Sequence, residues 1–247
     1  IILQSNESIE LERKQVELLI NKRVDGIIMS LSNESNFDEH IKEIINRNIP
    51  FVMFDKISKL ANCSKVLIDD QKAAMSATQH LIDKGCRKIV HIRCPLNPQN
   101  AIDRYIGYKK TLDKNQIPYD PTLVYTCENV TFQEGLDFAK QIIEEHPDVD
   151  GVFAVTDLVA VGVLSYFNDH QVKVPQQVAV IGFSNWFMSQ VLTPKLSTID
   201  QPSHEMGVAS FNLLLEEMHA HKENIPFTPK TIILETSVIE RDSSKKS

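Results

Sequence analysis

The chain has 247 residues, of which 42% are hydrophobic and 24% charged, and its formal net charge is -7. This acidic balance argues against a broad nucleic-acid surface, which needs clustered Lys and Arg, and the composition is typical of a soluble globular protein. No apolar run approaches the roughly 18 residues that a bilayer-spanning helix needs, so membrane insertion is not expected.

Cysteine usage indicates a reducing compartment. The four cysteines, Cys63, Cys86, Cys94 and Cys127, show neither C-x-x-C spacing nor the dense spacing of secreted domains. We therefore expect reduced thiols in a cytoplasmic protein. Cys94 follows a predicted strand, where it either touches a ligand or is a small, half-buried side chain. The chain begins with Ile1 and not with Met, so further sequence is expected to precede it.

Apolar patterns predict strands that alternate with helices along the whole chain. The predicted strands cover residues 1–4 (a strand end), 26–29, 51–54, 66–68, 89–92, 123–125, 149–155, 178–183 and 231–239. The predicted helices cover residues 8–21, 37–46, 73–84, 101–114, 131–145 and 203–219, with one more helical pattern between the strands 149–155 and 178–183. Residues 186–195 form an apolar loop, expected to be a ligand lid or a partner surface, and residues 241–247 form a polar tail.

The most informative stretch is residues 149–185, which predicts a β-α-β unit with two strands buried on both faces. Each strand ends abruptly at small polar residues. The first is followed by Thr156 and Asp157, and the second by Ser184 and Asn185. Both pairs should project from the carboxyl edge of a parallel sheet, which is the edge where ligands bind in open α/β folds.

Two segments near the start of the chain repeat this pattern. Residues 24–33 read VDGIIMSLSN against VDGVFAVTDL at 149–158, and IPFVMFD at 49–55 pairs with VPQQVAVIGFS at 174–184. Two matches in the same order indicate two similar α/β halves, whose polar edges would face one another across a cleft. The alternative is that any two parallel strands look alike.

Arg104 is the most unusual charged residue in the chain. It lies in the first turns of the predicted helix 101–114, where the helix dipole gives a cation no stabilisation. A ligand would explain the arginine, and a surface ion pair is the alternative. We expect Arg104→Ala to abolish ligand binding without lowering the melting temperature by much.

The sequence carries no recognisable catalytic or metal-binding motif. A dinucleotide or phosphate loop, a nucleophile elbow and H-E-x-x-H are all missing. Only His219 and His221 lie close together among the histidines, and two ligands do not close a zinc site. Asp69 and Asp70 are adjacent on a predicted strand, so their side chains should point to opposite faces and should not share acid/base work. We expect no cofactor, no metal and no enzymatic activity.

Eight motifs, in order, resemble the effector-binding region of the LacI/GalR family of bacterial transcriptional repressors, which is similar to periplasmic sugar-binding proteins of the ribose type. The resemblance covers nearly the whole chain. The motifs are VDGIIMSLS at 24–32, IPFVMFD at 49–55, VLIDDQKAA at 66–74, HLIDKGCRKIVHI at 80–92, DRYIGY at 103–108, VDGVFAVTDLVAVGVL at 149–164, VPQQVAVIGFSN at 174–185 and LTPKLSTIDQP at 192–202.

The resemblance implies an α/β fold of two Rossmann-like subdomains with parallel sheets, joined by three crossovers as in type I periplasmic binding proteins. The crossovers would fall near residues 68–69, 200–201 and 233–234. The N-terminal subdomain would then comprise residues 1–68 and 201–233, and the C-terminal subdomain residues 69–200 and 234–247. The family's first strand and helix have no counterpart in these 247 residues.

The resemblance also implies a ligand site. Arg104 matches the arginine of the family's R-x-x-G-aromatic motif, which binds effector hydroxyls or carboxylates, and Phe132 matches an aromatic residue that packs on the ligand. The expected ligand-binding residues are Ser30, Ser32, Asp55, Asn97, Arg104, Phe132, Thr156, Asp157, Ser184 and Trp186. The chain departs from the family at two places. Thr156-Asp157 stands where the family usually has Asn-Asp, and Ser184-Asn185 stands where the family usually has an acidic residue. The effector is therefore expected to be less polyol-like, or anionic and paired with Arg104.

These features predict the effector-binding and dimerisation region of a cytoplasmic LacI-type repressor. A sugar-like small molecule would act allosterically in the interdomain cleft, a homodimer would form through residues 188–192 and the helix 73–84, and operator DNA would be bound by an N-terminal helix-turn-helix absent from this chain. Whether the effector induces or corepresses is open. The alternatives are a periplasmic sugar-binding protein of an ABC transporter, and a hydrolase or isomerase on a similar scaffold.

Overall fold

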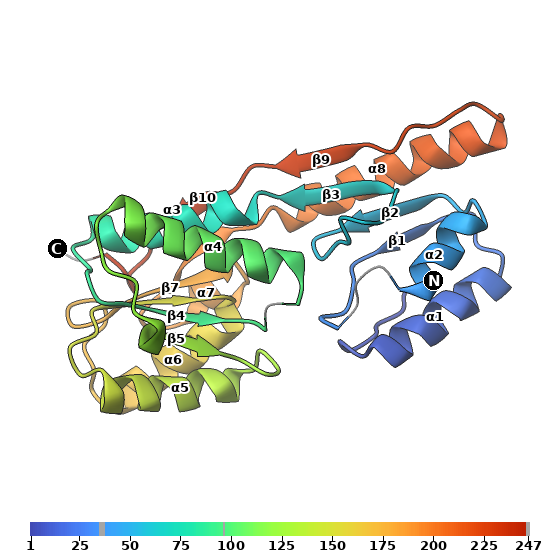
Figure 1. Ribbon diagram of the computed structural model, residues 1–247. Helices are drawn as coiled ribbons and strands as arrows, with labels where there is room; N and C mark the ends of the chain where they lie inside the picture. Colours follow the sequence, from blue (N-terminus) through green and yellow to red (C-terminus); the bar gives the residue numbers. More distant parts are fainter. Residues whose placement is uncertain (35–37, 96, 246–247) are drawn as a thin grey trace. The chain divides into compact units, whose positions relative to one another are not determined.

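The chain folds into two compact α/β units. The computed structural model describes residues 1–34, 38–95 and 97–245. Unit 1 comprises Ile1–Ile68, Asn97–Asn100 and Pro202–Glu235, and unit 2 comprises Asp69–Leu96, Ala101–Gln201 and Thr236–Ser247. Each unit is a sheet of mainly parallel strands with helices on both faces, as the alternating strand and helix patterns predicted (Figure 1).

Unit 1 is organised around a parallel sheet of order β1-β2-β3-β9. Its strands are β1 (Ile27–Met29), β2 (Phe51–Phe54), β3 (Ser64–Ile68) and β9 (Thr231–Leu234). Its helices are α1 (Ile9–Asn21), α2 (Glu39–Asn46) and α8 (Ser203–Lys222). Helix α8 packs against the first three strands, while α1 and α2 pack on one another and cover the other face (Figure 1). The core beneath them includes the fully buried Ile41, Ile44 and Met53.

Unit 2 contains a sheet of order β10-β8-β7-β6-β4-β5, in which β10 pairs antiparallel with β8 and the other pairs are parallel. Its strands are β4 (Ile89–Arg93), β5 (Val124–Thr126), β6 (Gly151–Ala154), β7 (Ala179–Ser184), β8 (Ser197–Asp200) and β10 (Ser237–Ile239). Its helices are α3 (Asp70–Asp83), α4 (Gln99–Lys114), the 3-10 turn η1 (Pro121–Leu123), α5 (Phe132–Glu145), α6 (Asp157–Asp169) and α7 (Met188–Val191). Helices α3 and α4 cover one face of the sheet and α5 and α6 the other (Figure 1).

Helices α5 and α6 approach one another closely through two glycines. A Cβ added at Gly162 would lie 2.2 Å from the carbonyl oxygen of Phe132, and one at Gly135 would lie 2.2 Å from that of Val159. Both contacts are to backbone, which cannot move aside as a flexible side chain can. The glycine pair therefore sets the position of the amino end of α5, where the candidate ligand residue Phe132 lies.

Gly162→Ala is expected to lower the free energy of unfolding by about 2 kcal/mol, because overpacking forces the backbone to shift. Urea denaturation followed by circular dichroism measures the loss. Gly207→Ala is the matched control, because a Cβ at this glycine of α8 meets nothing within 4 Å. The control should be neutral or stabilising, since Ala is the better helix former. Equal losses in the two variants would contradict the close packing of α5 on α6.

The structure corrects three sequence predictions. Residues 1–4 form no strand, and all four are exposed. Residues 197–200 form strand β8, which the apolar pattern missed because its buried positions include Ser197 and Thr198. The single predicted strand 231–239 is two strands, since β9 pairs with β3 in unit 1 and β10 pairs with β8 in unit 2.

Two further differences concern the ends of elements. Helix α2 begins at Glu39, and the expected inward position of Phe37 lies outside the described residues. The supposed polar tail contains Ser243 and Ser244, both fully buried, so this segment is part of the packing of unit 2.

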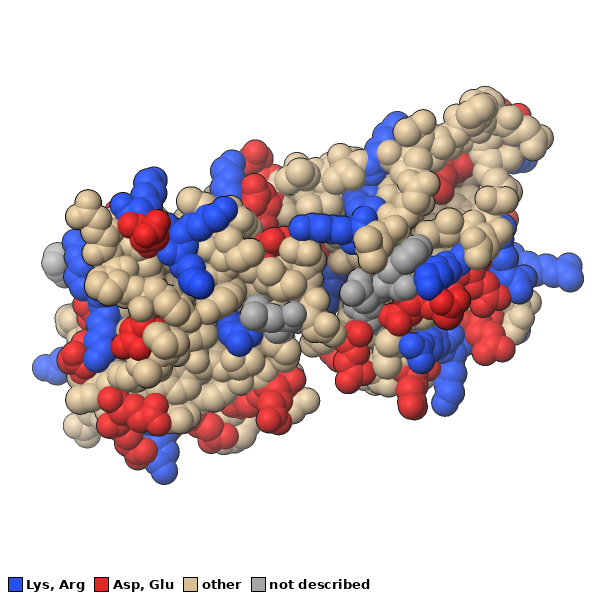
Figure 2. Space-filling view, in the orientation of Figure 1, with Lys and Arg blue, Asp and Glu red and all other residues tan. Residues whose placement is uncertain are grey.

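Surface charge is mixed. On the face shown in Figure 2, Lys and Arg are interspersed with Asp and Glu, in keeping with the net charge of -7. In the described ranges, no helix is long and apolar enough to cross a membrane.

Candidate functional site

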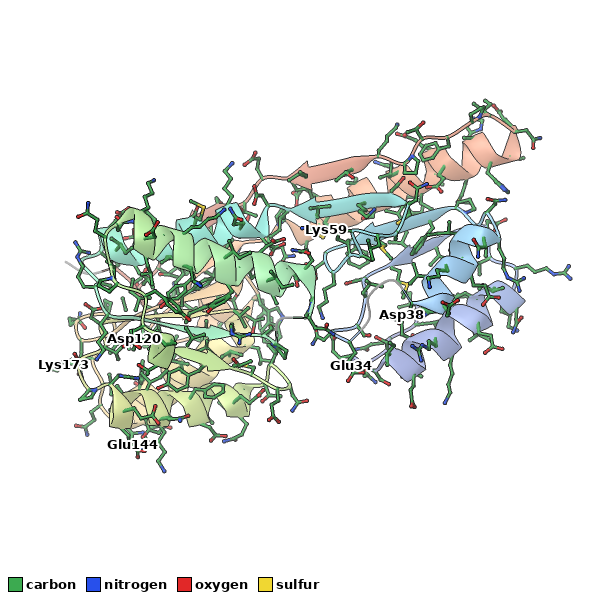
Figure 3. The ribbon with its side chains drawn as sticks, viewed as in Figure 1. Glu34, Asp38, Lys59, Asp120, Glu144 and Lys173 are labelled. Atoms are coloured by element: carbon green, nitrogen blue, oxygen red, sulfur yellow. The ribbon has the colours of Figure 1, made fainter. Side chains whose placement is uncertain are left out.

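Polar residues gather at the carboxyl edge of the unit 2 sheet. Strands β8, β7, β6 and β4 are neighbours, so the residues that follow them share one edge. These are Gln201 after β8, Asn185 after β7, Thr156 after β6 and Cys94 after β4. Charged residues such as Glu144 and Lys173 lie instead at the end of unit 2 where the strands begin (Figure 3). The carboxyl edge is the part of unit 2 with the chemistry of a ligand site.

Arg104 is buried beside this edge and not extended into solvent. It is 5% exposed, its Nε donates to Asp70 Oδ1 at 2.8 Å, and its Nη1 donates to the carbonyl oxygen of Val155 at 2.9 Å. The guanidinium also lies over the Phe183 ring, with Cζ 3.6 Å from the centroid. The remaining nitrogen, Nη2, has no hydrogen-bond partner among the described residues. Arg104 is thus held rigidly, with Nη2 outside these hydrogen bonds.

Gly107 brings Arg104 to its partner. A Cβ at Gly107 would lie 2.4 Å from the carbonyl oxygen of Gln71, so the glycine allows α4 to approach the start of α3, where Asp70 lies. Asp69 and Asp70 have separate roles, because Asp69 caps α3 by accepting the Lys72 N–H at 2.9 Å. The expectation that Arg104 could be removed at little cost in stability does not fit this burial, since its removal would break a buried ion pair with Asp70.

Asp157 is buried at the start of α6 and organises the loop after β7. Its Oδ1 accepts the Thr198 hydroxyl at 2.6 Å, and its Oδ2 accepts the Trp186 N–H at 2.7 Å. Burial raises the pKa of Asp157 to about 6, against the lowering effect of these two hydrogen bonds. Gly182 makes room for the carboxylate, because a Cβ there would lie 2.3 Å from Oδ1. Because only 1% of its surface is exposed, Asp157 contributes to the site indirectly, through its hydrogen bond to the Trp186 N–H.

The loop after β7 makes a sharp left-handed turn. Ser184 has φ 109° and Asn185 has φ 53°, both in the region that favours glycine. Strained backbone of this kind persists only where neighbours hold it in place, and it often occurs at ligand sites. The Ser184 hydroxyl donates to Gln201 Oε1 at 3.2 Å, and Asn185 Nδ2 donates to Asp200 Oδ1 at 2.7 Å.

Arg241 is a supporting residue that no sequence pattern indicated. Its Nη2 donates to Asn185 Oδ1 at 2.7 Å, and its Nη1 donates to the carbonyl oxygen of Leu196 at 2.8 Å. Its backbone is fixed to β8, because its N–H donates to Ser197 Oγ at 2.8 Å. Arg241 therefore stabilises the strained turn at Ser184 and Asn185, although it lies 56 residues beyond Asn185 in the chain.

The other candidates of unit 2 are a half-buried threonine and two exposed aromatic residues. Thr156 is the N-cap of α6, and its hydroxyl accepts the Val159 N–H at 3.4 Å. Trp186 is 47% exposed, and its ring meets that of Phe187 edge to face. Phe132 is 38% exposed and is the first residue of α5, after a capping box formed by Thr131 and Glu134. Helices α5 and α6 both begin at the carboxyl edge, so both provide side chains there.

The candidates of unit 1 lie at the carboxyl edge of its own sheet. Ser30 follows β1, and Asp55 follows β2 in a left-handed conformation with φ 54°. Ser32 is buried, and its N–H donates to Glu12 Oε2 at 2.6 Å. Asn97 is exposed and belongs to this unit, where its Nδ2 donates to the carbonyl oxygen of Asn33 at 2.9 Å.

Cys63 and Cys127 are buried cysteines. Burial raises the pKa of Cys63 to about 11 and that of Cys127 to about 12, so both are neutral thiols. Within the part of the chain that the structure describes, no group of three His, Cys, Asp or Glu side chains is placed to hold a metal ion.

Comparison with known proteins supports a ligand-binding regulator. Residues 78–244 match the family described as "Periplasmic binding protein-like domain". The ribose operon repressor of Halalkalibacterium halodurans is 29% identical over 245 residues, which is 99% of this chain and 70% of the repressor. The crystal structure of transcription regulator CcpA of Lactococcus lactis superposes with a TM-score of 0.87 at 30% identity, covering 99% of this chain and 87% of that one. A LacI family transcriptional regulator from Enterococcus faecium, solved with bound ribose, gives a TM-score of 0.83 at 26% identity, covering 94% and 83%.

Proposed function

Because the chain belongs to the periplasmic binding protein-like family of LacI-type transcriptional regulators, we propose that it binds a small sugar as the regulator's effector. The carboxyl edge of the unit 2 sheet carries the proposal. Hydroxyls, one guanidinium nitrogen and two exposed aromatic rings occur there together. A sugar presents both hydroxyl groups and an apolar C–H face, and this combination of side chains suits both.

In this proposal each residue has one task. Nη2 of Arg104 donates to a sugar hydroxyl, while its other contacts keep the guanidinium in place. The hydroxyls of Thr156 and Ser184 bind further sugar oxygens. The rings of Trp186 and Phe132 pack on the C–H face. Asp157 holds Trp186 and has no exposed surface for the ligand itself.

Ribose is the first effector to test, because a ribose operon repressor is among the relatives and one solved relative holds ribose. Ser30, Ser32, Asp55 and Asn97 remain predicted effector contacts. They lie at the carboxyl edge of unit 1, where Ser30 and Asp55 follow β1 and β2 as Thr156 and Asn185 follow β6 and β7.

Regulation is proposed to work by differential affinity. An effector that prefers one conformation of the regulator shifts the population toward it, and coupling of about 1–3 kcal/mol changes operator affinity about 5–150-fold. DNA would be contacted by a helix-turn-helix that is not among these 247 residues. A homodimer, formed in part by residues 188–192 and α3, would present two such elements to operator half-sites. The proposed location is the cytoplasm, where the operator lies.

The rival assignments are weaker. A periplasmic sugar-binding protein of a transporter is not favoured, because the relatives are transcriptional regulators. We propose no catalytic activity. The buried Asp157 and Arg104 are occupied by structural partners and do not form an acid/base pair at an open site.

Titration of Trp186 fluorescence with ribose tests the proposal, because Trp186 is the single tryptophan of the chain. A saturable change is expected, together with a rise in melting temperature. Ser184→Ala should weaken binding about five- to tenfold by removing one hydrogen bond. Thr122→Ala is the matched control, because this exposed threonine of η1 lies where β5 begins and its hydroxyl donates to Asp120 Oδ1 at 2.7 Å. If neither ribose nor a panel of other sugars, sugar acids and nucleobases changes the fluorescence or the melting temperature, the proposal is wrong.

A further inference from the structure

Unit 1 contains a pocket at the edge of its sheet opposite to Ser30 and Asp55. The pocket has a volume of about 360 Å³, within the range of small-molecule sites. It lies where β2 and β3 begin, since Phe51 and Cys63 line it. Much of its wall is apolar and is formed by Ile45, Ile49, Pro50, Phe51, Phe227 and Pro229. Unit 1 alone forms this pocket.

One half-buried carboxylate gives the pocket its polarity. Glu217 of α8 lines it, with Oε1 accepting the Phe51 N–H at 3.2 Å and Oε2 accepting the Ser64 hydroxyl at 3.4 Å. These two bonds fix the carboxylate and leave it further acceptor capacity, because each oxygen has two lone pairs. Burial raises the pKa of Glu217 above its ordinary value, because the charged carboxylate is poorly solvated there.

Among the described residues, no other side chain of the lining forms an ion pair with this carboxylate. No lysine or arginine is among the described residues that line the pocket. The Cys63 thiol is neutral, because burial raises its pKa to about 11. The nearby ammonium of Lys65 is held by the carbonyl oxygens of Ala61 and Cys63, at 2.5 and 3.2 Å. His221 lines the pocket one turn beyond Glu217, and its electrostatic effect on the pKa of Glu217 opposes that of burial, but no ion pair joins the two in the described part of the chain.

We infer that this pocket binds a small organic ammonium ion with an apolar body. The ammonium group would donate to the Glu217 carboxylate, and the body would pack on Ile49, Phe51 and Phe227. A cation at this position offsets the cost of burying the carboxylate, whereas a neutral ligand does so less and an anion is repelled. The site is independent of the sugar proposed for unit 2, because it lies at the other edge of a different sheet.

Isothermal titration calorimetry with 2-phenylethylamine tests the inference, because at neutral pH this probe combines an ammonium with an aromatic body. Its neutral and anionic counterparts are 2-phenylethanol and phenylacetate. The amine is expected to bind at least about tenfold more tightly than the alcohol, and phenylacetate should not bind. Glu217→Gln should weaken binding of the amine by about tenfold or more, although glutamine still offers an acceptor to the Phe51 N–H.

Glu223→Gln is the matched control, because Glu223 is exposed at the end of α8 and lies outside the pocket lining. It should leave the affinity unchanged. A measurement that needs no variant accompanies it: in NMR spectra of the wild-type protein, the amine should shift the amide signals of Phe51 and Ser64 and leave the Trp186 indole signal unmoved. Equal affinities for amine and alcohol, no loss with Glu217→Gln, or no binding up to about 10 mM would each overturn the inference.

Discussion

Arg104→Ala is expected to reduce the free energy of unfolding of unit 2 by about 3–5 kcal/mol, because breaking a buried ion pair leaves its partner charge uncompensated. Arg104 and Asp70 are 5% and 7% exposed, with Nε 2.8 Å from Oδ1. The same change removes the contact between the guanidinium and the Phe183 ring. Effector binding should also be lost, but as part of a wider disruption of the strand edge.

Urea denaturation followed by Trp186 fluorescence measures this effect, because the single tryptophan lies in unit 2. Lys88→Ala is the control, since the pair of Lys88 with Asp148 is more exposed and should contribute less than about 1 kcal/mol. Arg104→Lys separates stability from binding. It keeps the charge beside Asp70 but lacks the planar fork, so it should retain most of the stability and lose effector affinity. A similar small loss for Arg104→Ala and Lys88→Ala would show that the buried pair does not support the fold.

Asp157 is expected to make unit 2 more stable as the pH falls from about 7 to about 4. Burial raises its folded-state pKa to about 6, above the unfolded value of about 3.9. The folded state therefore binds the proton more tightly. Above pH 6 the buried carboxylate is charged and destabilising, and protonation relieves this cost as the pH falls through 6. Below about pH 4 Asp157 is protonated in both the folded and the unfolded state, so the free energy of unfolding no longer increases. The total increase is about 3 kcal/mol.

The comparison with Asp157→Asn isolates this effect from the other carboxylates, which titrate in both proteins. Asparagine keeps one oxygen acceptor for Thr198 or Trp186 but does not titrate, so the variant lacks the gain. The stability advantage of the wild type over Asp157→Asn should grow by up to about 3 kcal/mol between about pH 7 and about pH 4. Urea denaturation at the two pH values, followed by Trp186 fluorescence, measures it. A difference that does not change with pH would mean that Asp157 has an ordinary pKa.

Most of the fold could be predicted from the sequence, because strands that are buried on both faces require continuous apolar runs. The runs around Val152 and Val180 became β6 and β7, and the polar residues that follow them came to one edge of a parallel sheet. The prediction failed where burial was carried by small polar side chains. Ser197 and Thr198 are buried in β8, but their hydroxyls bond to Arg241 and Asp157, so the strand has no apolar signature.

The sequence by itself determined the alternation of strands and helices and the positions of Thr156, Ser184 and Trp186 at or just after the ends of buried strands, because both follow from local apolar periodicity. Only the tertiary structure decided which polar side chains face inward. Arg104 meets Asp70 across two helices, and Arg241 reaches Asn185 from a segment 56 residues away. Such hydrogen bonds depend on how distant segments pack, and they leave no periodic pattern in the chain because each involves single residues on separate elements.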